Sequence, residues 1–297
     1  MVVPVDLDPG ADRREERLLR SSPRLPLVFS KALLTAPGRH GTTLPAAELG
    51  LSEVHVDRGH LAAYDRVCGF RLGDDLPPTY PHVLAFPLQV ALMADRSFPF
   101  SLPGLLHVRN AITQYRPIGV GEHLDLHVHA ERLRPHRAGR QFDLVSRVEV
   151  DGEEVWEGRA TYLSRGGGDE AAPAEGPEVD VPATATARWQ VPGDVGRRYA
   201  AVAGDLNPIH LHPVAARAFG FPRAIAHGMW AKARALAALE GRLPDRLTAA
   251  VAFRRPLVVP ATVEVATRRI DRGWDLAIRR EEGGAYLAMA VREGPSP

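Results

Sequence analysis

The chain repeats itself, and this repeat limits its fold more than any other feature of the sequence. Three segments of the first half have counterparts in the same order in the second half, at offsets of 139, 135 and 141 residues. The pairs are RPIGVGEHLDLHV from Arg116 with RPLVVPATVEVAT from Arg255, VDRGHLAAYDRVCGF from Val56 with VPGDVGRRYAAVAGD from Val191, and LAFPLQVALM from Leu84 with IAHGMWAKAR from Ile225. Such a repeat predicts one architecture built twice.

Each repeat has the same order of predicted elements: a short strand and helix, a loop, a longer helix and then several strands. The long helix of the second half is predicted over Gly228–Glu240, and its few charges indicate burial on most sides. Strands are predicted at Leu247–Arg254, Thr262–Arg268, Trp274–Arg280 and Ala285–Val291, because these segments are β-branched or alternating and are bounded by Pro and Gly. In the first half, Leu124, Leu126 and Val128 alternate with polar residues, as in a half-buried antiparallel strand. A buried helix wrapped by an antiparallel sheet, twice in one chain, is an α+β architecture.

Composition divides the chain into four parts. Residues 1–50 are rich in Arg, Pro and Gly and are predicted to form an irregular lead-in, with a short helix in the segment DRREERLLR. The first repeat occupies 51–164 and the second 189–297. Between them, 165–188 are dominated by Gly, Pro, Ala and acidic residues without apolar periodicity, which predicts a linker.

The charge balance and the single cysteine exclude several classes of protein. The net charge of the 297 residues is +1, so nothing favours nucleic acid or an anionic membrane as partner. Cys68 is the only cysteine, which excludes an intramolecular disulfide and a cysteine-rich zinc site. With no secretory signal pattern and no apolar run of roughly 20 residues, the expected location is the cytoplasm.

One segment of the second repeat, YAAVAGDLNPIH from Tyr199 to His210, carries an acid and a base. Asp205 and His210 are separated by Asn207-Pro208, and proline disfavours helix in the residue before it, so the segment is predicted to be a turn. A turn of this kind brings two side chains together, as general acid–base catalysis requires. Gly204 would let the backbone bend sharply before Asp205. A short helix is predicted from Pro213 to Phe219, ended by Gly220.

Gly228, at the start of the predicted long helix, completes the set. Removing water from a 3-hydroxyacyl thioester takes a proton from the carbon beside the carbonyl and gives one to the departing hydroxyl. The carbon acid is weak unless the negative charge on the thioester oxygen is stabilised. A backbone N–H at a helix N-terminus supplies that stabilisation, and the missing side chain of Gly228 lets the oxygen approach.

AGDLNPIH followed by IAHG resembles the signature of the MaoC-like (R)-specific enoyl hydratases and 3-hydroxyacyl dehydratases. Two-halved members of that family are double hot-dogs, in which a long helix is held in a curved antiparallel sheet twice over. The resemblance covers nearly the whole chain, is close to the mycobacterial 3-hydroxyacyl-thioester dehydratases, and includes LPPTYPHVLAFP and HVRNAITQYRPI in the first half. It implies that Asp205 and His210 are catalytic, that the Gly228 amide forms the oxyanion hole, and that Asn207 orients the turn or a bound water.

The first half departs from this pattern. At the offset of 135, Phe70 stands in place of Asp205 and no histidine follows in register. At the offset of 141, Pro87 stands in place of Gly228, and proline has no N–H to donate. The first half is therefore predicted to be non-catalytic and to accommodate the acyl chain, a role that the two-halved relatives imply.

Other histidines and arginines are given structural interpretations. His227 is expected to fix the loop beside Gly228 by hydrogen bonding, and His212 to lie at a helix entry. His123, His127 and His129 are interpreted as the solvent face of one strand rather than as a metal site. The basic loop from Arg132 to Arg140 is expected to be a solvated hairpin tip, with contact to a coenzyme A phosphate or an acidic carrier protein as the weaker alternative.

The resulting hypothesis is a double hot-dog enzyme that interconverts (3R)-3-hydroxyacyl and trans-2-enoyl thioesters in fatty-acid metabolism, without a metal or other cofactor. The substrate would be an acyl-CoA or an acyl-ACP thioester. The alternatives are a hot-dog thioesterase and a non-catalytic acyl-binding subunit. Chain length, carrier, physiological direction, the member of the pair that takes the carbon proton, and assembly as a homodimer of double hot-dogs are left open by the sequence.

Overall fold

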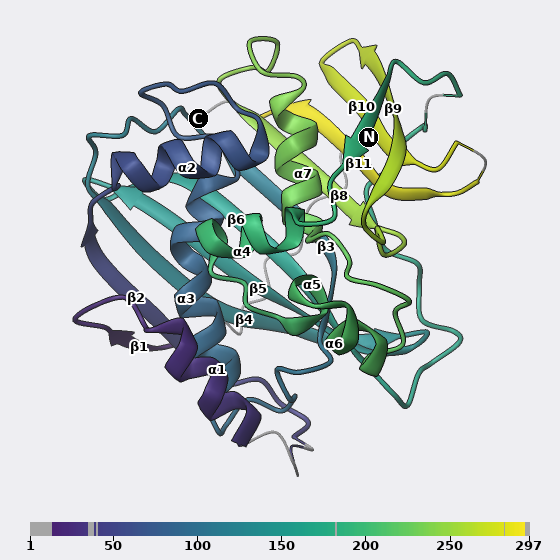
Figure 1. The fold of residues 1–297 in the computed structure, drawn as a ribbon. Coiled ribbons are helices and arrows are strands. Elements are labelled where there is room, and N and C mark those ends of the chain that lie inside the picture. The colour runs from purple at the N-terminus through teal and green to yellow at the C-terminus, as the bar shows by residue number, and fades with distance from the viewer. Residues whose placement is uncertain (1–13, 35–38, 40, 182, 282, 295–297) are drawn as a thin grey trace, which may run out of the picture.

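The computed structural model describes residues 14–34, 39, 41–181, 183–281 and 283–294, and within them one eleven-stranded sheet runs through both repeats (Figure 1). The strand order is β1-β2-β4-β5-β6-β3-β8-β11-β10-β9-β7. The strands are β1 Glu15–Leu18, β2 Ala47–Val54, β3 Leu106–Gln114, β4 Leu124–His136, β5 Gly139–Val150, β6 Glu153–Arg165, β7 Ala187–Val191, β8 Leu247–Phe253, β9 Ala261–Ile270, β10 Gly273–Arg279 and β11 Ala285–Glu293.

The helices gather on one side of this sheet (Figure 1). They are α1 Leu25–Leu34, α2 Arg58–Cys68, α3 Tyr80–Ala94, α4 Val195–Ala203, α5 Pro208–Leu211, α6 Pro213–Ala218 and α7 Gly228–Ala237. The mixed helix and antiparallel-sheet architecture confirms the predicted α+β class. Within the described part of the chain, no helix has the length and apolarity needed to cross a membrane.

The two repeats meet where β3 pairs with β8. This antiparallel ladder runs from Arg109 opposite Ala252 to Gln114 opposite Leu247. On either side of it the strand order is the same when read outward, with β6, β5, β4 and β2 matching β11, β10, β9 and β7. The halves therefore form one continuous sheet with an approximate two-fold relation, as the sequence repeat predicts.

The helices that precede the two long helices show the repeat in atomic detail. Both α2 and α4 end at a glycine in the left-handed region, with φ of 84° at Gly69 and 71° at Gly204. A residue with a side chain is strained at such a φ, so glycine is the natural choice at both positions. The two helices pack against each other, and their Tyr64 and Tyr199 rings have centroids 6.3 Å apart.

The predicted strands of the second half are confirmed to within two residues, and α7 begins at Gly228 as predicted. It ends at Ala237 rather than Glu240, and α6 ends at Ala218 rather than Phe219. Between β6 and β7, the described residues 166–181 and 183–186 form no regular structure. They are docked rather than free, since Glu175 accepts hydrogen bonds from Arg109 and Arg134, each 2.7 Å long.

The prediction of an irregular lead-in over 1–50 is wrong where the structure describes it; residues 1–13 lie outside the described part. The lead-in contains β1, α1 and the start of β2. The helix predicted in DRREERLLR is also wrong, because Glu15–Leu18 form a strand that pairs in parallel with β2. Edge pairing of this kind depends on a distant strand, so local composition does not reveal it.

The predictions for the histidines of β4 and for the basic hairpin Arg132–Arg140 are also wrong in part. His129 is only 4% exposed, so it does not lie on a solvent face; its Nε2 is 3.1 Å from a Glu131 carboxylate oxygen. The hairpin tip is not simply solvated either. Arg134 forms ion pairs with Asp143 and Glu175, so its charge is neutralised by carboxylates of the protein itself.

Lys232 of α7 is fully buried between the two repeats. Its Nζ lies 2.5 Å from Asn110 Oδ1 on β3 and 2.8 Å from the Ala249 carbonyl oxygen on β8. Burial lowers the pKa of this amine well below the ordinary lysine value. The unfolded chain therefore binds one more proton than the folded chain between the lowered pKa and 10.5.

We expect this proton to make stability rise with pH. The free energy of unfolding should increase by up to about 1.4 kcal/mol per pH unit as the pH rises from neutral toward the ordinary lysine pKa. Denaturant titrations of the wild type and of Lys232→Met across this range measure the effect. The variant should lack this component of the rise, and a constant difference between the two proteins would contradict the assignment.

Candidate active site

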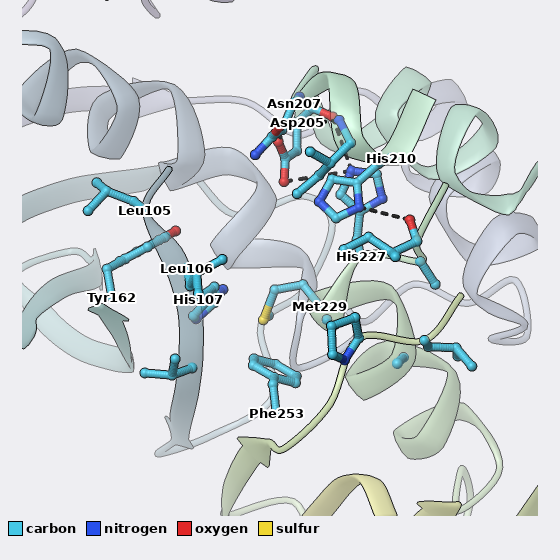
Figure 2. A pocket seen from close by; sticks show the side chains of 18 of the residues that line it. Leu105, Leu106, His107, Tyr162, Asp205, Asn207, His210, His227, Met229 and Phe253 are labelled. Atoms are coloured by element: carbon cyan, nitrogen blue, oxygen red, sulfur yellow. Dashed lines mark hydrogen bonds and ion pairs between the residues drawn. The ribbon is translucent and has the colours of Figure 1, made fainter. Parts of the chain in front are cut away.

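A cavity of about 440 Å³ lies between the repeats and contains the catalytic candidates (Figure 2). The second repeat contributes Asp205, Asn207, His210, His227 and Gly228 to its lining. The rest of the wall is mostly apolar and comes from both repeats. The first repeat contributes Val83, Phe86, Val90, Met93, Leu102 and Leu105, and α1 adds Phe29. An enclosed apolar cavity with a few polar groups converging at one end has the form of a small-molecule site.

Local backbone constraints shape the turn that carries Asp205. Gly204 ends α4 and its N–H donates to the Ala200 carbonyl, after which the chain reverses. The Asp205 side chain then accepts from the Asn207 N–H at 3.2 Å. Asn207 in turn caps α5, its Oδ1 accepting from the Ile209 N–H at 3.4 Å, with Pro208 as the first helical residue. These contacts hold the turn without help from a ligand.

His210, on α5, is held in one tautomer. Its Nδ1 donates to the Ile225 carbonyl oxygen over 2.8 Å, since a carbonyl can only accept. In the neutral ring, Nε2 is then the acceptor. Burial lowers the pKa of His210 below its ordinary value of 6.5, against an opposing effect of the Asp205 carboxylate. The neutral ring is thus favoured at neutral pH, with its basic nitrogen available.

His227 contacts both Asp205 and His210. Its Nε2 donates to the Asp205 backbone carbonyl over 3.1 Å and lies 3.6 Å from the Asp205 carboxylate. Its ring stacks on His210, with centroids 3.7 Å apart. Burial and the neighbouring His210 lower the pKa of His227 well below 6.5, so this ring is also neutral. His227 therefore fixes the Asp205 loop and also precedes Gly228 as the N-cap of α7.

Gly228 is the first residue of α7 and lines the cavity. The first N–H groups of a helix have no partner within the helix and carry its positive partial charge. A Cβ at this position would lie 3.0 Å from the Phe253 ring, so any larger residue would crowd the cavity wall.

The sequence analysis missed two residues that place His210. Gly196, in the first turn of α4, lies so close to α5 that a Cβ there would be 2.1 Å from the His210 carbonyl oxygen. A glycine inside a helical pattern is a known signal of close backbone approach and could have pointed to it. The second is Ile225, which bonds His210 through its backbone carbonyl. Because every residue has this carbonyl, the residue type gives no signal of the role.

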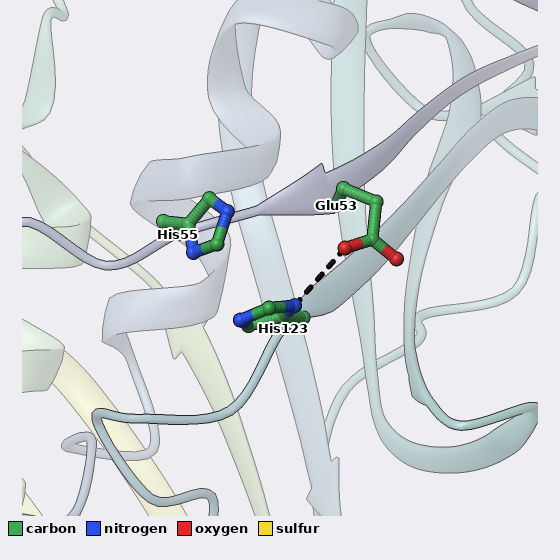
Figure 3. A group of neighbouring side chains, drawn as sticks. All are labelled: Glu53, His55 and His123. Atoms are coloured by element: carbon green, nitrogen blue, oxygen red, sulfur yellow. Dashed lines mark hydrogen bonds and ion pairs between the residues drawn. The ribbon is translucent and has the colours of Figure 1, made fainter.

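Two groups of side chains in the described part of the chain have the composition of metal ligands. The first is Asp205, His210 and His227, whose candidate ligand atoms lie within 4.8 Å of one another. Both of its imidazoles already donate from one ring nitrogen to a backbone carbonyl. The second group, Glu53, His55 and His123, is fully exposed on the first repeat, and a 3.0 Å bond joins His123 to Glu53 (Figure 3). The expectation that no metal is needed stays a prediction.

The corresponding positions of the first repeat are occupied differently. Phe70 directly follows the helix-ending Gly69, as Asp205 follows Gly204, and it is buried in the core. Pro87 lies inside α3 rather than at a helix start, because α3 already begins at Tyr80. This repeat thus has neither the turn carboxylate nor a helix N-terminus at the equivalent place.

Comparison with known proteins agrees with this geometry. Residues 170–280 match the MaoC like domain. The chain is 40% identical over 255 residues to 3-hydroxyacyl-thioester dehydratase X of Mycobacterium tuberculosis, covering 84% of this chain and 90% of that protein. The crystal structure of that protein, HtdX, superposes with a TM-score of 0.74 at 39% identity, covering 83% of this chain and 99% of the other. A further Mycobacterium tuberculosis protein, described as a double hot-dog, matches at a TM-score of 0.52 and 14% identity, over 82% of this chain and 92% of its own.

The fold is therefore a double hot-dog, with a cavity at the junction of the two repeats. The chain belongs to the MaoC-like dehydratase family, and it is a lyase that acts by removal or addition of water.

The close approach at Gly196 generates a direct test of the turn. Gly196→Ala should push α5 away from α4, because the new methyl group meets a backbone atom that cannot rotate aside. We expect a loss of about 1–3 kcal/mol of stability and, through displacement of His210, a loss of activity on the order of 100-fold. Thermal unfolding and turnover measure the two effects.

Gly193→Ala is the matched control. This glycine lies in the same region and has a Cβ position whose nearest neighbour is at an ordinary 3.4 Å. It should change neither stability nor turnover appreciably. Equal behaviour of the two variants would show that His210 does not depend on the contact between α4 and α5.

Proposed function

We propose that this protein reversibly dehydrates (3R)-3-hydroxyacyl thioesters to trans-2-enoyl thioesters, with Asp205 and His210 as the acid–base pair. The observation that carries the proposal is the convergence of three groups on one largely apolar cavity: a carboxylate, an imidazole with a free basic nitrogen, and a helix N-terminus. The substrate class follows the name of the 40% identical relative, a 3-hydroxyacyl-thioester dehydratase.

The hydrogen bonds of His210 support separate roles for Asp205 and His210 in the proton transfers. Since Nδ1 of His210 is engaged with Ile225, its Nε2 is the atom that faces the oxygen chemistry. In dehydration, Asp205 takes the proton from C-2, the proton passes to His210, and His210 delivers it to the departing hydroxyl, which leaves as water. The candidate atoms of the two side chains lie within 4.8 Å of each other, a gap that one water molecule or the substrate hydroxyl would bridge for the proton. Hydration runs through the same steps in reverse.

Between these proton transfers, negative charge resides on the thioester oxygen. The N–H of Gly228 is assigned to that oxygen. A fixed donor at a helix N-terminus, in a cavity with few competing waters, stabilises an enolate more strongly in the transition state than in the ground state. No side chain at this position obstructs the approach, which supports the assignment.

The first repeat is assigned the acyl chain. Its contribution to the cavity comes from α3, the segment before β3, and the strands β3 and β6, and α1 adds Phe29. Apolar side chains there would cover the methylene groups of the substrate and exclude water from the reacting carbons. The loss of the catalytic residues from this repeat agrees with such a role.

Arginines near the cavity are assigned to the thioester carrier. Arg165, Arg254 and Arg255 line the cavity and are exposed, as expected of residues at an opening to solvent. Guanidinium groups bind phosphate well, and both coenzyme A and acyl carrier protein present the acyl group on a phosphorylated arm. These residues replace the Arg132–Arg140 hairpin as the candidate phosphate site.

Asp205→Asn and His210→Gln should each fold normally and lose activity by roughly 100- to 10,000-fold, as expected for removal of a general acid or base. The measurement is the decrease of enoyl absorbance on incubation with enoyl thioesters on either carrier, run in parallel with a thiol reagent. Loss of the enoyl signal without free thiol supports the proposal. Thiol release would instead indicate a thioesterase, and substantial turnover by either variant would overturn the assignment.

A neighbouring histidine provides the matched control. His212 lies two residues from His210 and caps α6 by accepting from the Val214 N–H. His212→Asn can keep that cap and should retain full turnover. A comparable loss in this variant would mean that disturbance of the turn, rather than removal of a catalytic group, lowers the rate.

The lowered pKa of His210 predicts the pH dependence of the reaction. The proposed cycle starts with neutral His210 and ionised Asp205, so protonation of His210 inhibits. Because burial lowers this pKa, kcat/KM for hydration should stay level at neutral pH and fall only below the ordinary histidine value of 6.5. A pH–rate profile of the wild type and of His212→Asn checks this. An inflection well above 6.5 in both proteins would contradict the proposed starting state.

A further inference from the structure

An aromatic column runs from the core of the first repeat to the cavity. Phe142 stacks on Tyr162 with centroids 5.9 Å apart, Tyr162 on His107 at 4.8 Å, and His107 on His82 at 6.2 Å. The last three of these rings line the cavity, and each carries a polar atom. Apart from this column and Arg165, the first repeat contributes aliphatic and phenyl groups to the cavity wall.

Some polar atoms of this column make no hydrogen bond within the part of the chain that the structure describes. Nε2 of His107 is buried and has no hydrogen bond. The hydroxyl of Tyr162, which lines the cavity, makes no hydrogen bond to any described residue. Behind them, Gln89 bonds His82 and Ser146 through its Nε2, while its Oε1 is also unpartnered. Tyr162, His82 and Gln89 are at most 8% exposed. Buried polar groups are normally satisfied by protein, water or a ligand, so the unpaired Nε2 of His107 marks a place where a polar ligand group can bond.

The column lies next to the reacting groups. The edge of Phe253 meets His107 with centroids 5.1 Å apart, and the same Phe253 ring lies against Gly228. Figure 2 shows the Tyr162 hydroxyl directed into the cavity on the side opposite His210. The charge of Asp205 is close enough to influence the pKa of both Tyr162 and His82. An acyl chain whose thioester oxygen binds at Gly228 would therefore run past these rings shortly beyond C-3.

A plain hydrocarbon chain fits this wall poorly. It would remove water from the Tyr162 hydroxyl without replacing the lost hydrogen bond, and it would leave the buried Nε2 of His107 unpaired. Unsatisfied buried polar groups are costly. A hydroxyl group on the chain can both accept and donate. It would accept from Tyr162 and pair with the neutral His107, whose pKa burial keeps well below the ordinary value.

We propose that Tyr162 and His107 form a polar subsite that selects acyl chains carrying a hydroxyl group beyond C-3. The proposal rests on the acyl-thioester function proposed above and adds the chemical class of the chain. Sites built to hydrogen-bond a substrate hydroxyl discriminate strongly against analogues that lack it, because their own polar groups are then left unpaired.

The test compares decenoyl thioesters of pantetheine, the arm that both carriers share, with and without a single hydroxyl placed in turn at each carbon beyond C-3. For at least one position, the wild type should hydrate the hydroxylated chain with a kcat/KM higher by about tenfold or more. Tyr162→Phe and His107→Leu should bring this ratio close to one, chiefly by lowering kcat/KM for the hydroxylated chain.

Leu105→Ala is the control, because it enlarges the same cavity without removing a polar atom. It should change both substrates alike and keep the ratio. The proposal is overturned if the wild type prefers no hydroxylated chain, or if Tyr162→Phe lowers turnover of the plain chain as much as that of its hydroxylated partner. The latter result would place Tyr162 at the reacting hydroxyl instead.

A binding measurement separates the failure of this proposal from the failure of the catalytic one. Saturated decanoyl pantetheine thioesters, with and without the preferred hydroxyl, are titrated calorimetrically into the wild type and Tyr162→Phe. Tighter binding of the hydroxylated chain by the wild type alone supports the subsite even if no enoyl thioester is hydrated. Equal binding of both chains contradicts the subsite whatever the catalytic result.

Discussion

The backbone ladder between β3 and β8 is the interaction on which the rest of the structure depends. It joins two repeats that are each too small to enclose the cavity, and it places His107 of one near Phe253 of the other. A slip of one residue would turn both side chains to the opposite face of the sheet. Lys232 ties α7 to both strands of this ladder, so the helix that presents Gly228 is positioned by the same junction.

The turn that carries Asp205 and His210 is held by contacts within the protein. Gly204 reverses the chain, Asn207 caps the short helix, and the Ile225 carbonyl fixes the His210 tautomer. Each of these contacts uses a backbone group, which does not reorient when charge develops on the substrate. Preorganised groups of this kind lower the barrier because no reorganisation accompanies the reaction.

The features that the sequence predicted well are those whose signal is local. Four strands of the second half follow from alternation and flanking Pro or Gly, and the start of α7 follows from Gly228 and the apolar run after it. The features that it missed depend on a distant partner. β1 exists because β2 accepts it at the sheet edge, and His129 is buried beside Glu48 and Glu131 rather than facing solvent. Gly196 is an intermediate case. The sequence shows a glycine within a helical segment, but it does not show that His210 is the residue packed against it.

The two repeats share a fold but have diverged in the part of the chain that follows the shared helix-ending glycine. In the second repeat that part became a polar turn leading to the start of α7 at Gly228. In the first repeat Phe70 entered the core, and α3 begins before the position that Gly228 would occupy. A longer α3 removes one potential oxyanion site, yet it also brings His82 and Phe86 into the wall of the shared cavity. The absence of a helix start at Pro87 and the contribution of α3 to the shared cavity are thus consequences of the same change in helix length.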